Sequence, residues 1–204
     1  MTLVIPKGHY WVDYRSSRWL ILPDVFEPRP NFANDPLVTP RNIEMYAGKR
    51  VLDIGTGCGV RAVITALAGA SYVLATDIVA NALLCACFNA KLHRVDIDVR
   101  YHDMFDCISD KFDAIVAYLP SFDLPIARET DIAENDPDLE LHKRLIVEAK
   151  NFLRPGGVLY TTFLDQGRLN WFVKLIEQNS YTILNHKVMT HLQEEWHFFD
   201  LTLK

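Results

Sequence analysis

The chain has 204 residues, half of them apolar, with a formal net charge of −5 at neutral pH. A chain of this length can bury a large core without disulfides or metals, so we predict one α/β domain. The acidic balance argues against bulk binding to nucleic acid or an anionic membrane, and with neither a signal peptide nor a membrane-spanning run we expect a cytoplasmic protein.

The N-terminal region predicts a small hairpin or lid. Residues 10–14 and 19–22 read as two short strands within an N-terminal segment at 1–38, ahead of a main domain at 39–204. A Pro-Arg-Pro stretch around Arg29 then predicts an extended path, because each proline restricts its own backbone and that of the residue before it.

Three alternating glycines follow the first strand of the main domain. Gly55, Gly57 and Gly59 come directly after an apolar strand at 51–54 and precede a helix-like run from residue 60. Such glycines allow a sharp turn and leave no side chain between the backbone and a ligand, while the helix N-terminus offers free N–H groups. We therefore expect a ligand to lie across this turn.

The residues around the turn indicate which ligand it suits. A second apolar strand at 72–75 leads to Asp77, about 20 residues after the turn, where doubly wound folds place a carboxylate that binds a ribose diol. The glycines lack the G-x-G-x-x-G spacing of dinucleotide-binding turns. Asp53, just before them, would repel a pyrophosphate but suits a cationic ligand. A nicotinamide-dependent oxidoreductase is therefore disfavoured.

Residues 53–59, Asp-Ile-Gly-Thr-Gly-Cys-Gly, together with Asp77 resemble the cofactor site of the class I S-adenosylmethionine-dependent methyltransferases. The resemblance implies that the turn passes under the methionine end of the cofactor and that Asp77 holds the ribose hydroxyls. It also implies that Asp103 accepts from the adenine amino group and that Met104 packs on the ring; a helix cap is the alternative for Asp103. The implied cofactor contacts are Asp53, Gly55, Thr56, Gly57, Gly59, Asp77, Ile78, Asp103, Met104 and Tyr118.

Residues 25–30, followed by 35–38, resemble the approach to the catalytic domain in the small-domain amino methyltransferases, which include release-factor glutamine and ribosomal-RNA guanine methyltransferases. In those enzymes a Pro-Arg-Pro-like stretch passes near the cofactor and the substrate mouth. This implies a substrate contact for Arg29, with a surface position in a stiff loop as the alternative. Leu-Arg-Pro-Gly-Gly at 153–157 resembles a turn found at this place across class I methyltransferases.

The residues that follow the strand at 112–117 differ from the motif that these families have at this place. These families end the strand with Asn-Pro-Pro-Tyr or Asp-Pro-Pro-Tyr, whose first side chain and first proline carbonyl accept hydrogen bonds from the amino group that is methylated. Here Tyr118 replaces the Asn, and only the second proline, Pro120, is kept. The resemblance implies that Tyr118 and Pro120 occupy the catalytic position, where a phenol oxygen and a backbone carbonyl remain as acceptors.

An acidic segment at 123–138 predicts a loop over the site, with a solvated loop as the alternative to substrate recognition. The candidate substrate contacts are Arg29, Tyr118, Phe122 and Asp123. An amine acceptor would suit the acidic side chains, whereas a hydroxyl acceptor would require a general base. The nearest candidates for that base are Tyr118, His102 and Asp123.

The four cysteines form no C-x-x-C pair and have no histidine at metal-ligand spacing beside them. We predict that all are reduced core thiols, that the chain has no metal site, and that the cysteine inside the glycine turn has no catalytic role. These residues are Cys58, Cys85, Cys87 and Cys107.

The remaining sequence alternates between helix and strand. Helices are expected at 61–68, 80–93, after Pro137 and at 170–178, and strands at 98–101, 158–163, 181–187 and 196–203. Together with the resemblance, this predicts a Rossmann-like, doubly wound α/β fold with a seven-stranded, mostly parallel sheet. The implied strand order is 3-2-1-4-5-7-6, with the last strand antiparallel to its neighbours.

These features predict methyl transfer from S-adenosylmethionine to nitrogen or oxygen of a small molecule or peptide, with S-adenosylhomocysteine as product. The first alternative is an N-methyltransferase for protein glutamine or an RNA base, which a basic patch beside the site would favour. The second is a protein that binds S-adenosylmethionine without methyl transfer, as a regulatory subunit or a repurposed fold. That alternative predicts cofactor binding with no acceptor pocket.

Overall fold

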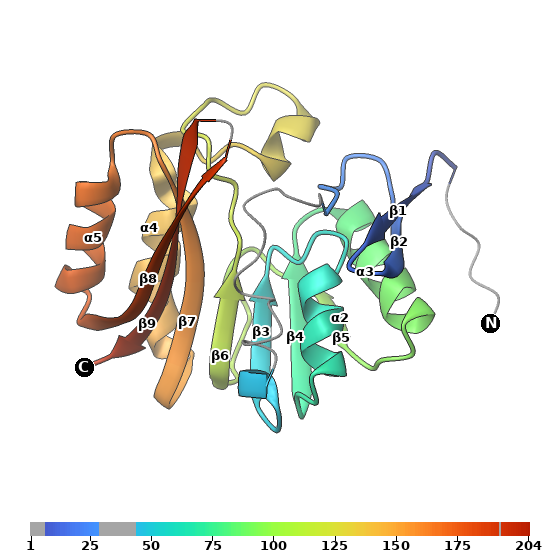
Figure 1. Ribbon diagram of the computed structural model, residues 1–204, viewed down its shortest axis with the longest axis horizontal. Helices are drawn as coiled ribbons and strands as arrows, with labels where there is room; N and C mark the ends of the chain where they lie inside the picture. Colours follow the sequence, from blue (N-terminus) through green and yellow to red (C-terminus); the bar gives the residue numbers. More distant parts are fainter. Residues whose placement is uncertain (1–6, 29–43, 192) are drawn as a thin grey trace.

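A seven-stranded sheet forms the centre of the computed structural model, which describes residues 7–28, 44–191 and 193–204 (Figure 1). The strands are β3 (Arg50–Ile54), β4 (Tyr72–Asp77), β5 (Asp98–Tyr101), β6 (Phe112–Ala117), β7 (Leu153–Asp165), β8 (Tyr181–His191) and β9 (Glu194–Leu203). Their order is β5-β4-β3-β6-β7-β9-β8, and β9 alone runs in the direction opposite to the other six strands. Counted without the hairpin strands, this is the predicted order 3-2-1-4-5-7-6, so the fold prediction is confirmed.

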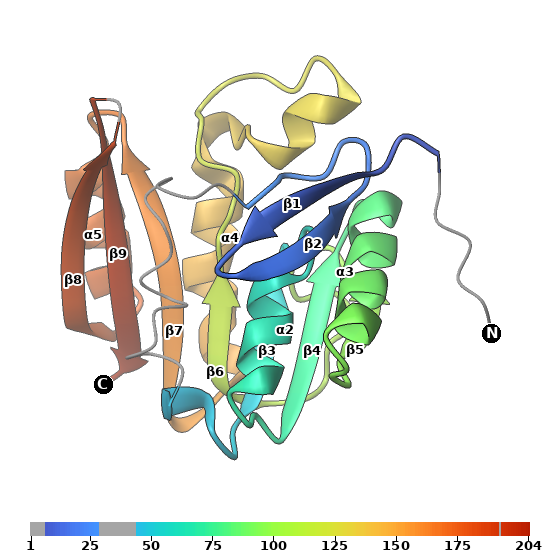
Figure 2. The ribbon, with the colours of Figure 1, turned by 45° about the vertical axis from the view of Figure 1, so that its right-hand side comes forward.

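Helices cover both faces of the sheet (Figures 1 and 2). They are α2 (Val60–Leu67), α3 (Ala80–Leu92), α4 (Glu140–Glu148) and α5 (Leu169–Gln178), with the short 3-10 helices η2 (Glu44–Tyr46), η3 (Glu129–Ala133), η4 (Pro137–Leu139) and η5 (Ala149–Asn151). Leu52 packs in one core with Leu145 of α4 and Phe172 of α5, whereas its neighbour Val51 packs in another with Ile64 of α2. Successive strand residues face opposite ways, so a strand covered on both sides is mainly apolar, as Val51, Leu52 and Ile54 of β3 are. None of the described helices has the length and apolar character needed to cross a membrane.

An antiparallel hairpin of β1 (Tyr10–Tyr14) and β2 (Ser17–Ile21) lies against α3, as the N-terminal pattern predicts (Figure 2). The side chain of Asn89 on α3 fixes the hairpin to this helix. This buried side chain accepts the N–H of Leu20 at 2.8 Å and donates to the carbonyls of Leu20 at 2.9 Å and Cys58 at 2.8 Å. One amide therefore joins the hairpin, α3 and the glycine turn, which explains a polar residue on the buried side of this helix.

The prediction that all four cysteines are core thiols holds only in part. Cys58 and Cys85 are buried, and burial raises their pKa to about 12 and about 11. Cys87 on α3 is half-buried, and Cys107 is exposed. Cys107 lies between β5 and β6 with a left-handed φ of 62°, so it belongs to a surface turn rather than to an element packed on the sheet.

Candidate cofactor and acceptor site

The glycine turn joins β3 to α2 and has a left-handed backbone at each of its glycines. A Cβ atom on Gly59 would lie 2.7 Å from Ala86 Cα, so this glycine lets α2 begin in close contact with α3. A Cβ atom on Gly57 would meet nothing within 4 Å. Gly55 and Gly57 line a cavity and Gly59 does not, which separates the ligand-facing part of the turn from its packing part.

Asp77 lies at the end of β4, where its carboxylate connects the turn to the start of α3. Oδ2 accepts the N–H of Gly57 and Oδ1 accepts the N–H of Val79, both at 2.9 Å. Burial raises the pKa of Asp77, although these backbone hydrogen bonds oppose the shift. Asp77 and Ile78 both line the cavity. A carboxylate held by two backbone groups keeps further lone pairs for a ligand on its open side.

Asp53 is 1% exposed and lies behind the turn rather than in the cavity wall. Its Oδ2 accepts the hydroxyl of Thr56 at 2.7 Å, and its Oδ1 lies 3.5 Å from Nε of Arg61. Burial raises the pKa of Asp53, and the charge of Arg61 is the main opposing influence. Asp53 therefore acts on the cavity through Thr56 and Arg61, which both line it.

His102, Asp103 and Met104 follow β5 and line the cavity next to Asp77. Met104 is buried and has a left-handed φ of 51°. Oδ1 of Asp103 accepts a hydrogen bond from Arg144 of α4 at 2.8 Å. No helix begins within the described turn that follows β5, so Asp103 is not a helix cap.

Tyr118 follows β6, the strand beside β3, and lines the cavity next to the glycine turn. Its ring stacks on Trp196 of β9, with ring centres 5.8 Å apart and planes 11° apart. The guanidinium of Arg61 lies 4.8 Å from the centre of the same ring. Pro120 and Phe122 also line the cavity. Neither Arg61 nor Trp196 was predicted, because only the tertiary structure brings them to Tyr118.

The acidic segment after β6 forms a wall of the cavity, as its loop prediction suggested. Its two ends pair with each other: the N–H groups of Ser121 and Phe122 both donate to the carbonyl of Glu134 at 2.9 Å, and that of Asp136 donates to Phe122 at 2.8 Å. Glu134 and Asn135 line the cavity within this closed loop.

A buried pair of Asp136 and His142 anchors this loop to α4. Both side chains are fully buried, and Oδ2 of Asp136 lies 2.6 Å from Nδ1 of His142. Oδ1 of Asp136 accepts the N–H of Leu141, in the first turn of α4, at 2.8 Å. The other ring nitrogen of His142 lies 3.3 Å from the carbonyl of Thr162 on β7. The pair thus connects loop, helix and sheet.

The predicted substrate residue Asp123 is bonded within the loop instead of lining the cavity. Asp123 accepts the N–H of Asp138 at 2.7 Å and forms an ion pair with Arg168 at 3.0 Å, and it does not line the cavity. This position favours a structural role in the loop. Arg29 lies outside the described residues.

The cavity has a volume of about 760 Å³ and runs from Met104 and Asp77 past the glycine turn to Phe122 and Trp196. Val25 and Phe26, which follow the hairpin, form part of its wall. Among the described residues its acidic lining exceeds the two arginines, Arg61 and Arg144. The acidic residues that line it are Asp24, Asp77, Asp103, Glu134, Asp136, Glu140 and Glu194, and the carboxylate of Asp136 is bonded within the protein. Volumes of this order are typical of small-molecule sites.

Comparison with known proteins agrees with this architecture. Residues 37–170 match the family model of the methyltransferase small domain. A putative protein N5-glutamine methyltransferase of Methanocaldococcus jannaschii is 35% identical over 143 residues, covering 67% of this chain and 71% of that protein. A ribosomal protein L11 methyltransferase of Lactobacillus johnsonii is 34% identical over 198 residues, covering 87% of this chain but only 57% of that protein.

A solved structure shares the fold. The 16S rRNA N2 G1207 methyltransferase of T. thermophilus, in complex with AdoMet and guanosine, superposes with a TM-score of 0.63 at 20% identity, covering 94% of this chain and 50% of that one. The family model matches more than half of the chain. The chain therefore belongs to the methyltransferase small domain family and is an S-adenosylmethionine-dependent methyltransferase.

Proposed function

We propose that this chain transfers a methyl group from S-adenosylmethionine to a side-chain nitrogen of a polypeptide. The observation that carries the proposal is the far end of the cavity, where Tyr118, Phe122 and Trp196 stand beside the carboxyl groups of Glu134 and Glu194. Aromatic faces and carboxylates suit an amide or amine that donates N–H groups. The relatives named for glutamine and for ribosomal protein L11 support a protein acceptor rather than the small molecule predicted first.

The other end of the cavity fits the cofactor. Asp77 would hold the ribose hydroxyls, Met104 would pack on the adenine, and Gly55 and Gly57 would leave room for the methionine part. The predominance of carboxyl groups in the lining suits a sulfonium cation. Bound S-adenosylmethionine supplies an activated methyl group, so the chain's own task is to align the acceptor nitrogen and exclude water.

Alignment of the acceptor would fall to Tyr118 and to the closed loop that ends at Asp136. The Tyr118 ring is held between Arg61 and Trp196, which fixes its plane at the junction of the two ends. Its phenol oxygen and nearby backbone carbonyls would accept N–H bonds in place of the missing Asn. As the nitrogen gains the methyl group it loses a proton, for which the carboxylate of Glu134 is a suitable acceptor or relay to water.

The charge of the cavity disfavours an RNA acceptor. Both arginines in the described lining already face carboxylates, Arg61 near Asp53 and Arg144 on Asp103. An RNA substrate brings a phosphate backbone that proteins bind mainly with Lys and Arg. An acidic lining would repel that backbone but not a peptide with amide or amine side chains.

The test is transfer of a labelled methyl group from S-adenosylmethionine to three separated fractions: polypeptides, RNA and small metabolites. We expect label in a polypeptide, which mass spectrometry should locate on a side-chain nitrogen. Asp77→Ala should lose the activity, while Asp98→Asn, a change one strand away and outside the cavity lining, should keep it. Label confined to RNA or to small metabolites would contradict the proposal and favour the corresponding alternative.

A further inference from the structure

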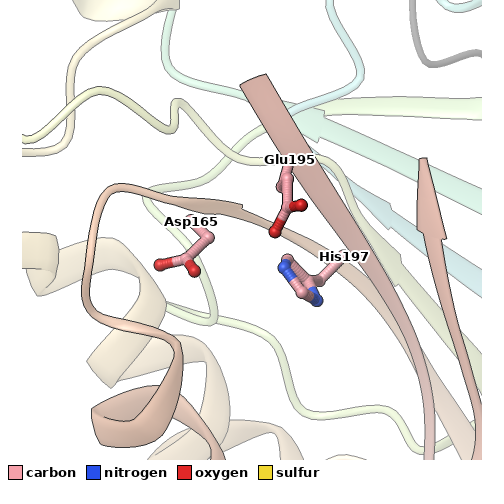
Figure 3. Close-up of side chains that lie close together, drawn as sticks. All are labelled: Asp165, Glu195 and His197. Atoms are coloured by element: carbon pink, nitrogen blue, oxygen red, sulfur yellow. The ribbon is translucent and has the colours of Figure 1, made fainter. Parts of the chain in front are cut away.

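Three potential metal ligands meet at one end of the sheet, on the strands β7 and β9. Asp165 ends β7 and pairs in register with Glu195 of β9, and His197 follows two residues later on the same side of that strand. One ligand atom from each of the three lies within 4.8 Å of the others (Figure 3). The sequence separates Asp165 from the other two by a helix and a strand, so spacing alone does not reveal the cluster.

His197 provides an independent indication of a ligand. The side chain is 3% exposed, and its Nδ1 lies 2.9 Å from Nε2 of His186 on β8. Its own Nε2 is buried and has no hydrogen-bond partner among the described residues. Figure 3 shows the imidazole facing the carboxylates of Asp165 and Glu195. Leaving a buried nitrogen without a hydrogen bond costs about 1–3 kcal/mol. We therefore expect a bound ligand between His197 Nε2 and the two carboxylates.

The negative charges of the two carboxylates are not neutralised by neighbouring lysine or arginine side chains in the described part of the chain. Oδ1 of Asp165 accepts the N–H groups of Gly167, Arg168 and Leu169 at the start of α5, which holds the side chain in place and leaves Oδ2 available. Glu195 is exposed and free to rotate. Within the described part of the chain, neither carboxylate forms an ion pair with Lys or Arg. Two uncompensated negative charges therefore lie beside a buried imidazole.

We propose that His197 Nε2, Asp165 and Glu195 bind a divalent transition-metal ion of the Zn²⁺ type. Imidazole and carboxylate are ordinary zinc ligands, and water would complete a four-coordinate site. Tetrahedral bonds of about 2.0–2.2 Å bring ligand atoms to within roughly 3.5 Å of one another. Rotation of the exposed Glu195, with a smaller rotation of the Asp165 carboxylate toward His197, would supply this contraction. His186 is then the outer partner that receives the Nδ1–H of His197 and sets its tautomer, as is common at metal sites.

The ion would have a structural role next to the acceptor end of the cavity. Trp196 lies between Glu195 and His197 on β9 and faces the opposite side of the sheet, where it stacks on Tyr118. Joining Asp165 to Glu195 and His197 would therefore hold the strand segment that presents Trp196. The proposal does not depend on which acceptor is methylated.

The test is calorimetric titration of the full chain with Zn²⁺ in a Cys107→Ser background, because an exposed thiol is itself a zinc ligand. We expect one ion per chain, reversal by EDTA and a rise in the unfolding temperature on binding. Glu195→Gln and His197→Gln should each weaken binding roughly tenfold or more. Glu177→Gln, a matched change at an exposed glutamate of α5, should not alter it.

Because His197 is buried, its variant must first be checked for native circular dichroism; Glu195 is exposed and its variant keeps the test decisive if His197→Gln does not fold. Absence of Zn²⁺ binding by the parent chain would overturn the proposal. Binding that is unchanged in Glu195→Gln would overturn it as well, since the ion would then lie elsewhere.

Discussion

The two ends of the cavity are built in different ways. The proposed cofactor end comes from the ends of three neighbouring strands, with the glycine turn after β3, Asp77 at the end of β4 and Met104 after β5. The acceptor end is assembled from Tyr118 after β6, a loop anchored by Asp136, and Trp196 on the distant β9. A short motif can therefore specify the first end, whereas the second depends on contacts between remote segments.

One chain of contacts links the two ends. Asp53 lies behind the glycine turn and holds Thr56 and Arg61, and Arg61 in turn lies over the ring of Tyr118. A change in one half can reach the other through these side chains. Variants that affect one end alone should therefore be separable by measurement.

The largest expected effect is on the anchor of the acceptor end. Asp136→Ala should destabilise the fold by about 3–5 kcal/mol, because it leaves the buried His142 and the part-buried N–H of Leu141 without their partner. Urea denaturation gives the free energy of unfolding directly. Asp138→Asn, at an exposed aspartate two residues away, is the control and should change it little. Similar losses in both variants would mean that the buried pair does not anchor the loop.

Alanine substitution at two glycines of the turn should lower the stability of the fold by different amounts. Gly59→Ala should cost roughly 2–4 kcal/mol of stability, because a Cβ there would overlap Ala86 and the residue has a φ of 81°. Gly57→Ala meets no atom within 4 Å and should cost only about 1–2 kcal/mol for its left-handed backbone. Thermal and chemical denaturation of both variants test this difference. Equal costs would show that α2 and α3 can move apart.

Asp77 should govern cofactor affinity. Asp77→Asn should weaken S-adenosylmethionine binding by about 1–3 kcal/mol, because the amide loses charge and acceptor capacity toward the ribose hydroxyls. Calorimetry with S-adenosylmethionine and S-adenosylhomocysteine measures the loss, with Asp98→Asn as control. If the affinity of Asp77→Asn for S-adenosylmethionine were unchanged, Asp77 would not bind the cofactor. Its role would then be limited to its hydrogen bonds with Gly57 and Val79.

Tyr118 should give the smallest effect and the sharpest distinction between the two ends. Tyr118→Leu removes the stack on Trp196 and the contact with Arg61, which is worth about 0.5–1.5 kcal/mol. We expect this loss in kcat/KM for the acceptor, with cofactor affinity unchanged. Steady-state kinetics and calorimetry on the same variant separate the two quantities. If cofactor affinity fell instead, Tyr118 would belong to the cofactor end.

Much of the fold was predictable because its signals are local. Apolar runs and glycines predicted the strands, helices and turn, and the resemblance supplied the strand order. The cysteines show where this reasoning fails, since Cys107 has an apolar side chain yet lies in an exposed turn. Residue type predicts average burial, but the path of the backbone decides it at each position.

The sequence alone determined most strands and helices, the glycine turn and the place of Asp77 at the end of a strand, because each depends on residues that are close together in the chain. The strand order came from the family resemblance. Only the tertiary structure joined Asp136 to His142, brought Tyr118 onto Trp196 and collected Asp165, Glu195 and His197 at one end of the sheet. Strand alternation shows which face of a strand is buried. Which side chains meet across strands depends on register and on long-range packing, and neither is visible in the local pattern.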